Sequence, residues 1–88
     1  MYYVYVLVSR KNKRKYVGVT ADLKRRLKEH NERLGGSYSK KNAPFELVFY
    51  EAFKAKRDAT KQELFYKSGY GREVLNGKIE WSLKELRD

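Results

Sequence analysis

The first twenty residues carry the hydrophobic pattern of a β-hairpin. Residues 2–9 and 15–20 are short runs rich in Tyr and Val, which favour strands, and the basic segment 10–14 between them is polar. Two such runs joined by a short polar loop pair as antiparallel neighbours. The pattern therefore predicts a hairpin at the start of the chain.

The length of the hairpin loop decides where the tyrosines lie. Facing residues of antiparallel strands point to the same side of a sheet, and side chains alternate with a period of two. An even-numbered loop pairs Tyr5 with Gly18 and Tyr16 with Leu7, so the two phenols become diagonal neighbours on one surface. An odd-numbered loop puts them on opposite faces. Gly18 has no side chain and leaves a hollow beside Tyr5, where backbone or a ligand approaches.

The middle of the chain predicts a helix and an exposed loop. A helix over 23–34 begins after Asp22, a favoured capping residue, and ends at Gly35 and Gly36. Residues 37–44 carry turn-forming residues and two lysines, so they read as an exposed loop.

The second half predicts one more strand and further helices. Residues 45–53 are aromatic and alternate, as a third strand does, and a second helix covers 57–68 and stops at Gly69. A turn at 69–71 leads into a short helical piece at 72–76. The last apolar residues fold back onto the core; they are Ile79, Trp81, Leu83 and Leu86.

Length and composition set the class of protein. The 88 residues have room for one core, so we expect a single domain over residues 1–88. It is of the α+β class, with a small three-stranded antiparallel sheet flanked by helices in the order β-β-α-β-α-α. No Cys is present, which excludes a disulfide partner and thiolate metal sites. A strand pattern starts directly after Met1, without a charged leader, and no apolar run is long enough to span a bilayer. We therefore expect a cytoplasmic protein without a membrane partner; the sequence does not indicate an oligomeric state.

The charge of the chain points to a class of partner. There are 21 Lys and Arg against 11 Asp and Glu, a net charge of +10. Such an excess favours polyanions, and the alternative is a basic surface that only keeps the protein in solution. We expect contacts to a nucleic-acid backbone from Lys11, Lys13, Arg14, Lys40 and Lys41.

Two polar residues fall on the inward side of the first predicted helix. With a turn of about 100° per residue, His30 lies within the stripe of Leu23 and Leu27, and Arg26 lies on its edge. The alternative is a core histidine bonded to backbone beside an arginine that extends to solvent. Together, an arginine and a histidine four residues apart suit an anionic ligand.

Glu63 is the acidic residue that faces inward on the second predicted helix, on the side of Ala59 and Tyr66. The alternative is an ion pair with Lys67, four residues later, on a solvated face. A carboxylate turned toward the core of a basic protein attracts a hard cation, Mg²⁺ or Mn²⁺, with substrate oxygens and water completing the coordination.

The candidate residues occur along the chain in the order of a known motif. They are Tyr5, Tyr16, Arg26, His30 and Glu63. Tyr3-Val4-Tyr5 and Tyr16-Val17-Gly18 are followed by Arg26 ten residues after Tyr16, by His30, and by Glu63 in the later helix. In this order they resemble the GIY-YIG nuclease family, in which the tripeptides form the two halves of the motif. The resemblance covers nearly the whole chain. It is similar above all to small stand-alone GIY-YIG proteins related to the nuclease domain of the bacterial excision-repair incision subunit.

The chain departs from the family pattern at three places. Tyr3 stands where the motif has its first Gly, and Val19 where repair-type members carry a lysine. At the expected distance beyond Glu63 there is Leu75, with Asn76 one residue later.

The resemblance implies a GIY-YIG fold and hydrolysis of phosphodiester bonds with one divalent ion held by Glu63. It also implies that Tyr5 or Tyr16 orients or deprotonates the attacking water. In this picture Arg26 neutralises charge on the scissile phosphate, and His30 assists proton transfer or binds phosphate. We expect DNA rather than RNA as substrate, cleaved nonspecifically or by its structure. The alternatives are a noncatalytic nucleic-acid-binding module of the same fold and a small RNA-binding adaptor.

Overall fold

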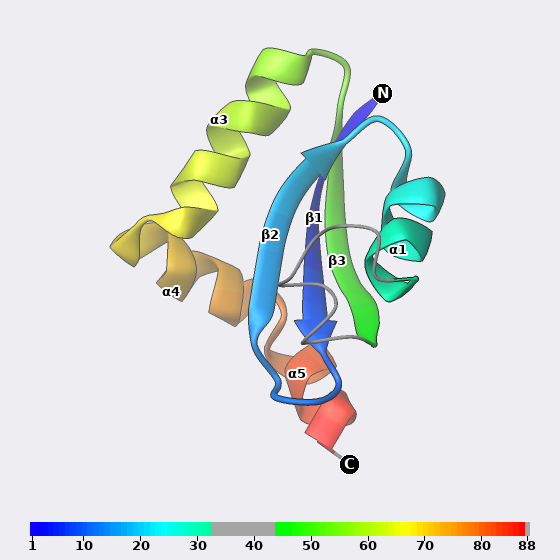
Figure 1. Cartoon of the computed structure of the whole chain (residues 1–88). Coiled ribbons are helices and arrows are strands. Elements are labelled where there is room, and N and C mark those ends of the chain that lie inside the picture. Colours follow the sequence, from blue (N-terminus) through cyan, green and yellow to red (C-terminus); the bar gives the residue numbers. More distant parts are fainter. Residues whose placement is uncertain (33–43, 88) are drawn as a thin grey trace.

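The computed structural model describes residues 1–32 and 44–87 and contains one antiparallel sheet with helices on both of its faces (Figure 1). The strand order is β2-β1-β3. The α+β class and the three-stranded sheet are confirmed, and the C-terminal part forms one helix more than the predicted order. The elements are β1 (Tyr2–Ser9), β2 (Lys15–Thr20), α1 (Leu23–Asn31), β3 (Phe45–Phe53), α3 (Lys56–Lys67), α4 (Gly69–Lys78) and α5 (Glu80–Arg87).

The hairpin has the even register. Tyr5 pairs with Gly18 and Leu7 pairs with Tyr16, as predicted. The turn is held by Ser9, whose hydroxyl accepts hydrogen bonds from two backbone amides of the loop at 3.1 and 3.3 Å. Lys13 takes the left-handed conformation, with φ of 63°, and this reversal brings the chain back into β2.

Both faces of the central strand are buried because helices cover both. Val4 and Val6 pack with residues of α3 and α4, including Tyr66 and Leu75. The alternate residues of β1 pack on the other face, where they meet Phe45 and the leucines of α1. A strand between two helical layers has apolar residues at successive positions, and this explains the nearly continuous apolar run of β1.

The expected turn at 69–71 is helical instead. These residues form the first turn of α4 because Ser68 caps it, with its hydroxyl accepting a hydrogen bond from the Gly71 amide at 3.1 Å. A serine at the start of a helix satisfies an amide that has no partner within the helix. The glycines therefore follow a helix break at Ser68 and do not form it.

Some predictions fall outside the described residues. The helix predicted over 23–34 is described as far as Asn31, and its predicted end at Gly35 and Gly36 lies beyond that part, as does most of the 37–44 loop. Across the two described ranges, no helix combines the length and apolar character that crossing a bilayer requires.

Candidate active site

Tyr5 is the centre of a buried polar cluster on the α1 face of the sheet. Its side chain is 2% exposed. The phenol oxygen accepts a hydrogen bond from Arg26 Nε at 3.3 Å and lies 3.4 Å from His30 Nε2. Arginine can only donate, so the Tyr5 oxygen is the acceptor in its contact with Arg26. Tyr5 thus contacts both polar side chains of α1.

Gly18 makes room for this phenol. A methyl group built at Gly18 lies 3.0 Å from Cε2 of Tyr5 and closer still to its hydroxyl. The hollow predicted at Gly18 is therefore real, but the ring of Tyr5 itself fills it. Any larger residue at position 18 pushes the phenol away from Arg26 and His30.

Tyr16 joins the same cluster from β2. Its ring packs edge-on against His30, with 4.9 Å between ring centroids, and lies 6.3 Å from the ring of Tyr5. The predicted placement of both tyrosines on one face is confirmed. Tyr16 is half-buried and also lines an open groove beside β2, whereas Tyr5 is buried. Tyr16 is thus the tyrosine that meets solvent.

Helix α1 presents its polar residues as its periodicity predicts. The Asp22 side chain caps it by accepting a hydrogen bond from the Arg25 amide at 3.0 Å. His30 is 2% exposed, Arg26 lies at the edge of the helix, half-buried and 3.7 Å from Glu29, and Arg25 faces solvent.

Burial and charge keep Tyr5 and His30 neutral beside Arg26. Burial raises the pKa of the Tyr5 phenol, and the nearby guanidinium of Arg26 opposes this only in part. Burial also lowers the pKa of His30, and the positive charge of Arg26 lowers it further. The hydrogen bond to Tyr5, with a smaller contribution from Tyr16, raises the pKa of Arg26. At neutral pH the site thus holds the neutral phenol of Tyr5, a neutral imidazole and a fixed cation.

Glu63 comes to this region from α3, which runs along β2. Its negative charge contributes to the raised pKa of Tyr5, so the carboxylate lies within electrostatic reach of the cluster. Its side chain is 20% exposed and forms an ion pair with Lys67 at 3.2 Å. Both alternatives for Glu63 are therefore present together: it is partly buried and it is paired within its own helix.

The side chains near Glu63 suit the binding of a hard cation only if a substrate supplies further ligands. Over the residues that the structure describes, no group of three or more His, Asp or Glu side chains converges on one point. Mg²⁺ keeps several waters and is often held by one or two carboxylates together with substrate phosphates. One carboxylate at Glu63 fits that mode and does not fit a preformed metal cage.

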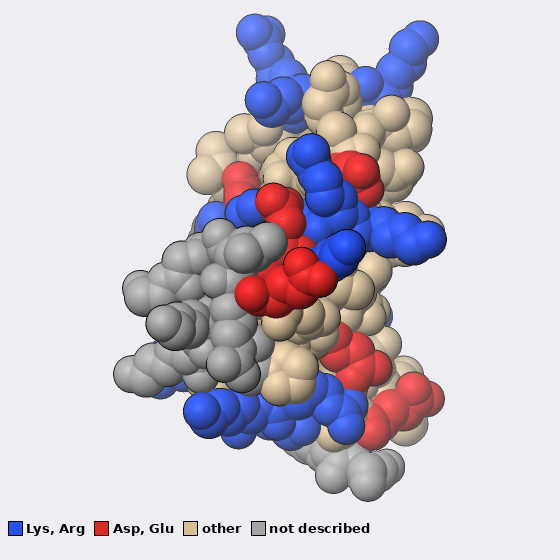
Figure 2. Space-filling view, turned by 45° about the vertical axis from the view of Figure 1, so that its right-hand side comes forward, with Lys and Arg blue, Asp and Glu red and all other residues tan. Residues whose placement is uncertain are grey.

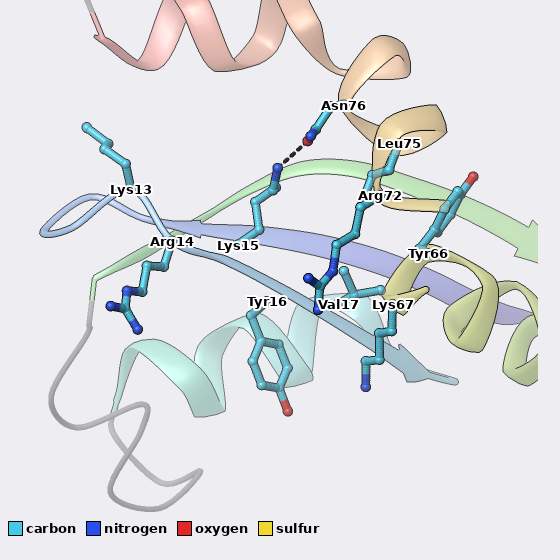
Figure 3. A pocket seen from close by; sticks show the side chains of 10 residues that line it. All are labelled: Lys13, Arg14, Lys15, Tyr16, Val17, Tyr66, Lys67, Arg72, Leu75 and Asn76. Atoms are coloured by element: carbon cyan, nitrogen blue, oxygen red, sulfur yellow. Dashed lines mark hydrogen bonds between the residues drawn. The ribbon is translucent and has the colours of Figure 1, made fainter. Parts of the chain in front are cut away.

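Beside β2 runs a groove of about 750 Å³ (Figure 3). Five of its ten lining residues are cationic, and within the described part of the chain none is acidic. Lining cations are Lys13, Arg14, Lys15, Lys67 and Arg72. On the α1 side of the molecule, in contrast, acidic side chains are mixed with basic ones (Figure 2).

The residues expected to contact a nucleic-acid backbone lie partly within the described ranges. Lys11, Lys13 and Arg14 are exposed in the hairpin turn, while Lys40 and Lys41 lie outside the described residues. Lys15, Lys67 and Arg72 were not among the expected contacts. Strand alternation is the signal for Lys15, because it shares a side of β2 with Val17, which packs on the α3 layer.

The departures from the family pattern have distinct surroundings. Val19 is half-buried and packs against the core between the sheet and α3. Leu75 is buried, at 1% exposed. Asn76 is exposed, lines the groove and accepts a hydrogen bond from Lys15 Nζ. The amide of this segment that reaches the groove is therefore Asn76.

The chain is similar in sequence to a known family and to known proteins. The model of the GIY-YIG catalytic domain matches residues 1–78. The UPF0213 protein YazA of Bacillus subtilis is 44% identical over 52 residues, which are 59% of this chain and 52% of that protein. A UPF0213 protein of Clostridium perfringens is 39% identical over 67 residues, 76% of this chain and 71% of that protein. The matched part of the chain thus spans between about half and about 70% of these relatives.

A solved structure is similar over most of the chain. The solution NMR structure of a UPF0213 protein from Bacillus halodurans is 36% identical, with a TM-score of 0.52. The match covers 88% of this chain and 84% of that one.

Proposed function

Because the chain belongs to the GIY-YIG catalytic domain family, which is nuclease-type, we propose that it is a metal-dependent endonuclease. It hydrolyses phosphodiester bonds in nucleic acid, and DNA is the preferred substrate over RNA. Cleavage is either selective for the structure of the substrate or nonspecific. The observation that carries the proposal is Arg26, whose Nε donates a hydrogen bond to the Tyr5 hydroxyl at 3.3 Å beside His30. A fixed cation beside a hydroxyl and an imidazole is a set of groups suited to phosphate transfer.

The two tyrosines have different roles in this proposal. Tyr16 lines the groove, so its hydroxyl orients the attacking water. Tyr5 is buried and bonded to Arg26 and lies against His30, so it positions those two side chains. Its raised pKa keeps it protonated at neutral pH, which argues against Tyr5 as the general base.

His30 and Arg26 complete the chemistry on the protein side. The imidazole is neutral at pH 7 because its pKa is lowered, so it is able to take a proton that arrives through the hydroxyl network. Arg26 uses Nε on Tyr5, and one terminal nitrogen lies 3.7 Å from Glu29; in the reaction its guanidinium neutralises the negative charge that develops on the scissile phosphate.

Glu63 is the residue that would hold a divalent ion, Mg²⁺ or Mn²⁺, and the substrate phosphate would complete its coordination. When bound, such an ion supplies Lewis-acid stabilisation of the phosphate and the leaving oxygen. The ammonium of Lys67 lies 3.2 Å from the Glu63 carboxylate.

The test is a cleavage panel on branched, nicked and supercoiled DNA and on structured RNA, with Mg²⁺ or Mn²⁺ and with a chelator. The wild type is compared with Arg26→Lys and with the matched control Arg25→Lys on the solvent face. Lysine keeps the charge but loses the planar fork. We expect metal-dependent cleavage by the wild type. The cleavage rate should fall by roughly 100-fold in Arg26→Lys and stay unchanged in Arg25→Lys.

The second candidate is a noncatalytic nucleic-acid-binding module. The cationic groove favours it, and so does the apolar Val19, which packs in the core where repair-type members carry a lysine. Salt-sensitive binding without any product across the panel would establish the module and overturn the nuclease.

A further inference from the structure

At one end of the groove, Lys15 and Asn76 point toward each other, and the side chain of Arg72 extends along the groove toward Val17 and Lys67 (Figure 3). Among the described residues, no acidic side chain lines this groove. Lys15 lies at the start of β2, and Arg72 and Asn76 lie one turn apart on α4; all three are exposed and line the groove (Figure 3). None of them belongs to the cluster around Tyr5.

The orientation of the Asn76 amide follows from its partner. The ammonium of Lys15 only donates hydrogen bonds, so the Asn76 atom that it contacts is the oxygen Oδ1. The amide nitrogen of Asn76, a donor of two hydrogen bonds, is therefore turned away from Lys15. Asn76 thus both fixes the lysine and offers a donor of its own.

The two cations repel each other in this arrangement. Burial lowers the pKa of Lys15, and the positive charge of Arg72 lowers it further. No carboxylate in the described ranges forms an ion pair with either of them. Glu80, which shares a neighbouring hollow with Lys15, is paired with Lys84 at 3.6 Å.

An anion with several acceptor oxygens in this part of the groove reduces the repulsion and offers acceptors to these donors. A phosphodiester group fits, because it carries one negative charge and accepts hydrogen bonds from Lys, Arg and amide groups alike. A carboxylate-bearing peptide fits less well, since the rest of the groove is also lined with cations that suit a repeating polyanion.

The place of these donors relates them to the candidate active site. Tyr16 and Lys67 line the same groove; Tyr16 packs on His30 at 4.9 Å, and Lys67 is paired with Glu63 at 3.2 Å. A strand that lies in the groove thus passes from Lys15 and Arg72 to the residues proposed for cleavage.

We propose that Lys15, Arg72 and Asn76 form a phosphate site that holds a backbone phosphate on one side of the cleaved bond. The site rests on the proposed function for its position relative to cleavage, but its binding role does not depend on catalysis. It fixes the strand along β2 without reading its sequence, because it contacts the backbone alone.

The test is equilibrium binding of a fluorescent branched DNA in a chelator, where no metal-dependent cleavage takes place. The double variant Lys15→Gln/Arg72→Gln is compared with Arg57→Gln/Lys61→Gln, which removes the same charge from a separate hollow on α3. The charge-keeping variant Lys15→Arg/Arg72→Lys and thermal unfolding of each protein control for folding.

We expect the groove variant to bind at least about tenfold more weakly. Its slope of log affinity against log salt should fall by about 0.9, the value for one phosphate contact on duplex DNA. The α3 control and the charge-keeping variant should stay within about threefold of the wild type, since a change of tenfold needs the loss of a whole charged contact. Equal losses in both double variants, or no loss in the groove variant, would overturn the site.

The cleavage panel separates the two proposals. If the wild type cleaves but the groove variant binds and cleaves like it, the phosphate site is wrong and the nuclease stands. If the wild type yields no product while the groove variant still loses affinity and salt slope, the phosphate site stands and the nuclease is wrong.

Discussion

At the scale of single residues, Tyr5 joins the cation and the imidazole of the buried cluster. Arg26 donates a hydrogen bond to the Tyr5 hydroxyl, and this hydroxyl lies 3.4 Å from His30 Nε2. The imidazole of His30 is buried next to the guanidinium of Arg26, and both effects lower its pKa, so it is neutral near pH 7. The cluster therefore contains a neutral base, His30, next to the fixed positive charge of Arg26.

This neutral histidine makes the stability of the fold depend on pH. The folded pKa of His30 lies below the ordinary value of 6.5, so below that pH the unfolded chain binds the proton more readily. We expect the free energy of unfolding to be constant above pH 7 and to fall as the pH drops from 6.5 toward the folded pKa. For the binding of one proton, the free energy of unfolding changes by at most about 1.4 kcal/mol per pH unit.

Urea unfolding between pH 5 and 8 measures this dependence, with His30→Gln as the comparison. The Gln variant should lose the slope in this range, whatever its absolute stability. The pKa of Glu51 is also shifted, downward from 4.5, but its contribution is lost below pH 4.5 and does not overlap. An unchanged slope in His30→Gln would show that His30 is not held neutral.

At the scale of elements, the hairpin register decides whether the site exists. The pairing of Tyr5 with Gly18 was predictable, since it needs only the period of two and an even loop. The α1 placement of Arg26 and His30 was predictable from helical periodicity. The helical start of α4 was not, because the cap at Ser68 is a local hydrogen bond that overrides the preference of two glycines for turns. The groove was also missed, because it requires the packing of α4 beside β2.

Gly18→Ala tests the fit between the strands. The added methyl group meets the Tyr5 ring, and overpacking of this kind costs about 1–3 kcal/mol of stability. Gly77→Ala in α4 is the matched control, since a methyl group there has nothing within 4 Å; it should stabilise the protein by about 0.4–1 kcal/mol. Thermal and urea unfolding should give opposite signs for the two variants. A neutral or stabilising Gly18→Ala would contradict the close packing of Tyr5 under Gly18.

At the scale of the whole molecule, the site draws on both helical layers. Arg26 and His30 come from α1 on one face of the sheet, whereas Glu63 comes from α3 on the other face. The edge strand β2, which carries Tyr16 and Gly18, contacts α3, and Tyr16 packs against His30 of α1. The excess of positive charge is likewise uneven, because the groove beside β2 is cationic while the α1 side carries both signs (Figure 2).

The central claim is that this shared edge is a metal-dependent catalytic centre, and the rate of DNA cleavage in Glu63→Ala tests it most directly. Glu73→Ala, which removes an exposed carboxylate from α4, is the control, and both variants are first shown to unfold at the temperature of the wild type. The account predicts that Mg²⁺- or Mn²⁺-dependent cleavage falls by at least about 100-fold in Glu63→Ala and is unchanged in Glu73→Ala. Metal-dependent cleavage that persists at the wild-type rate in Glu63→Ala would contradict it.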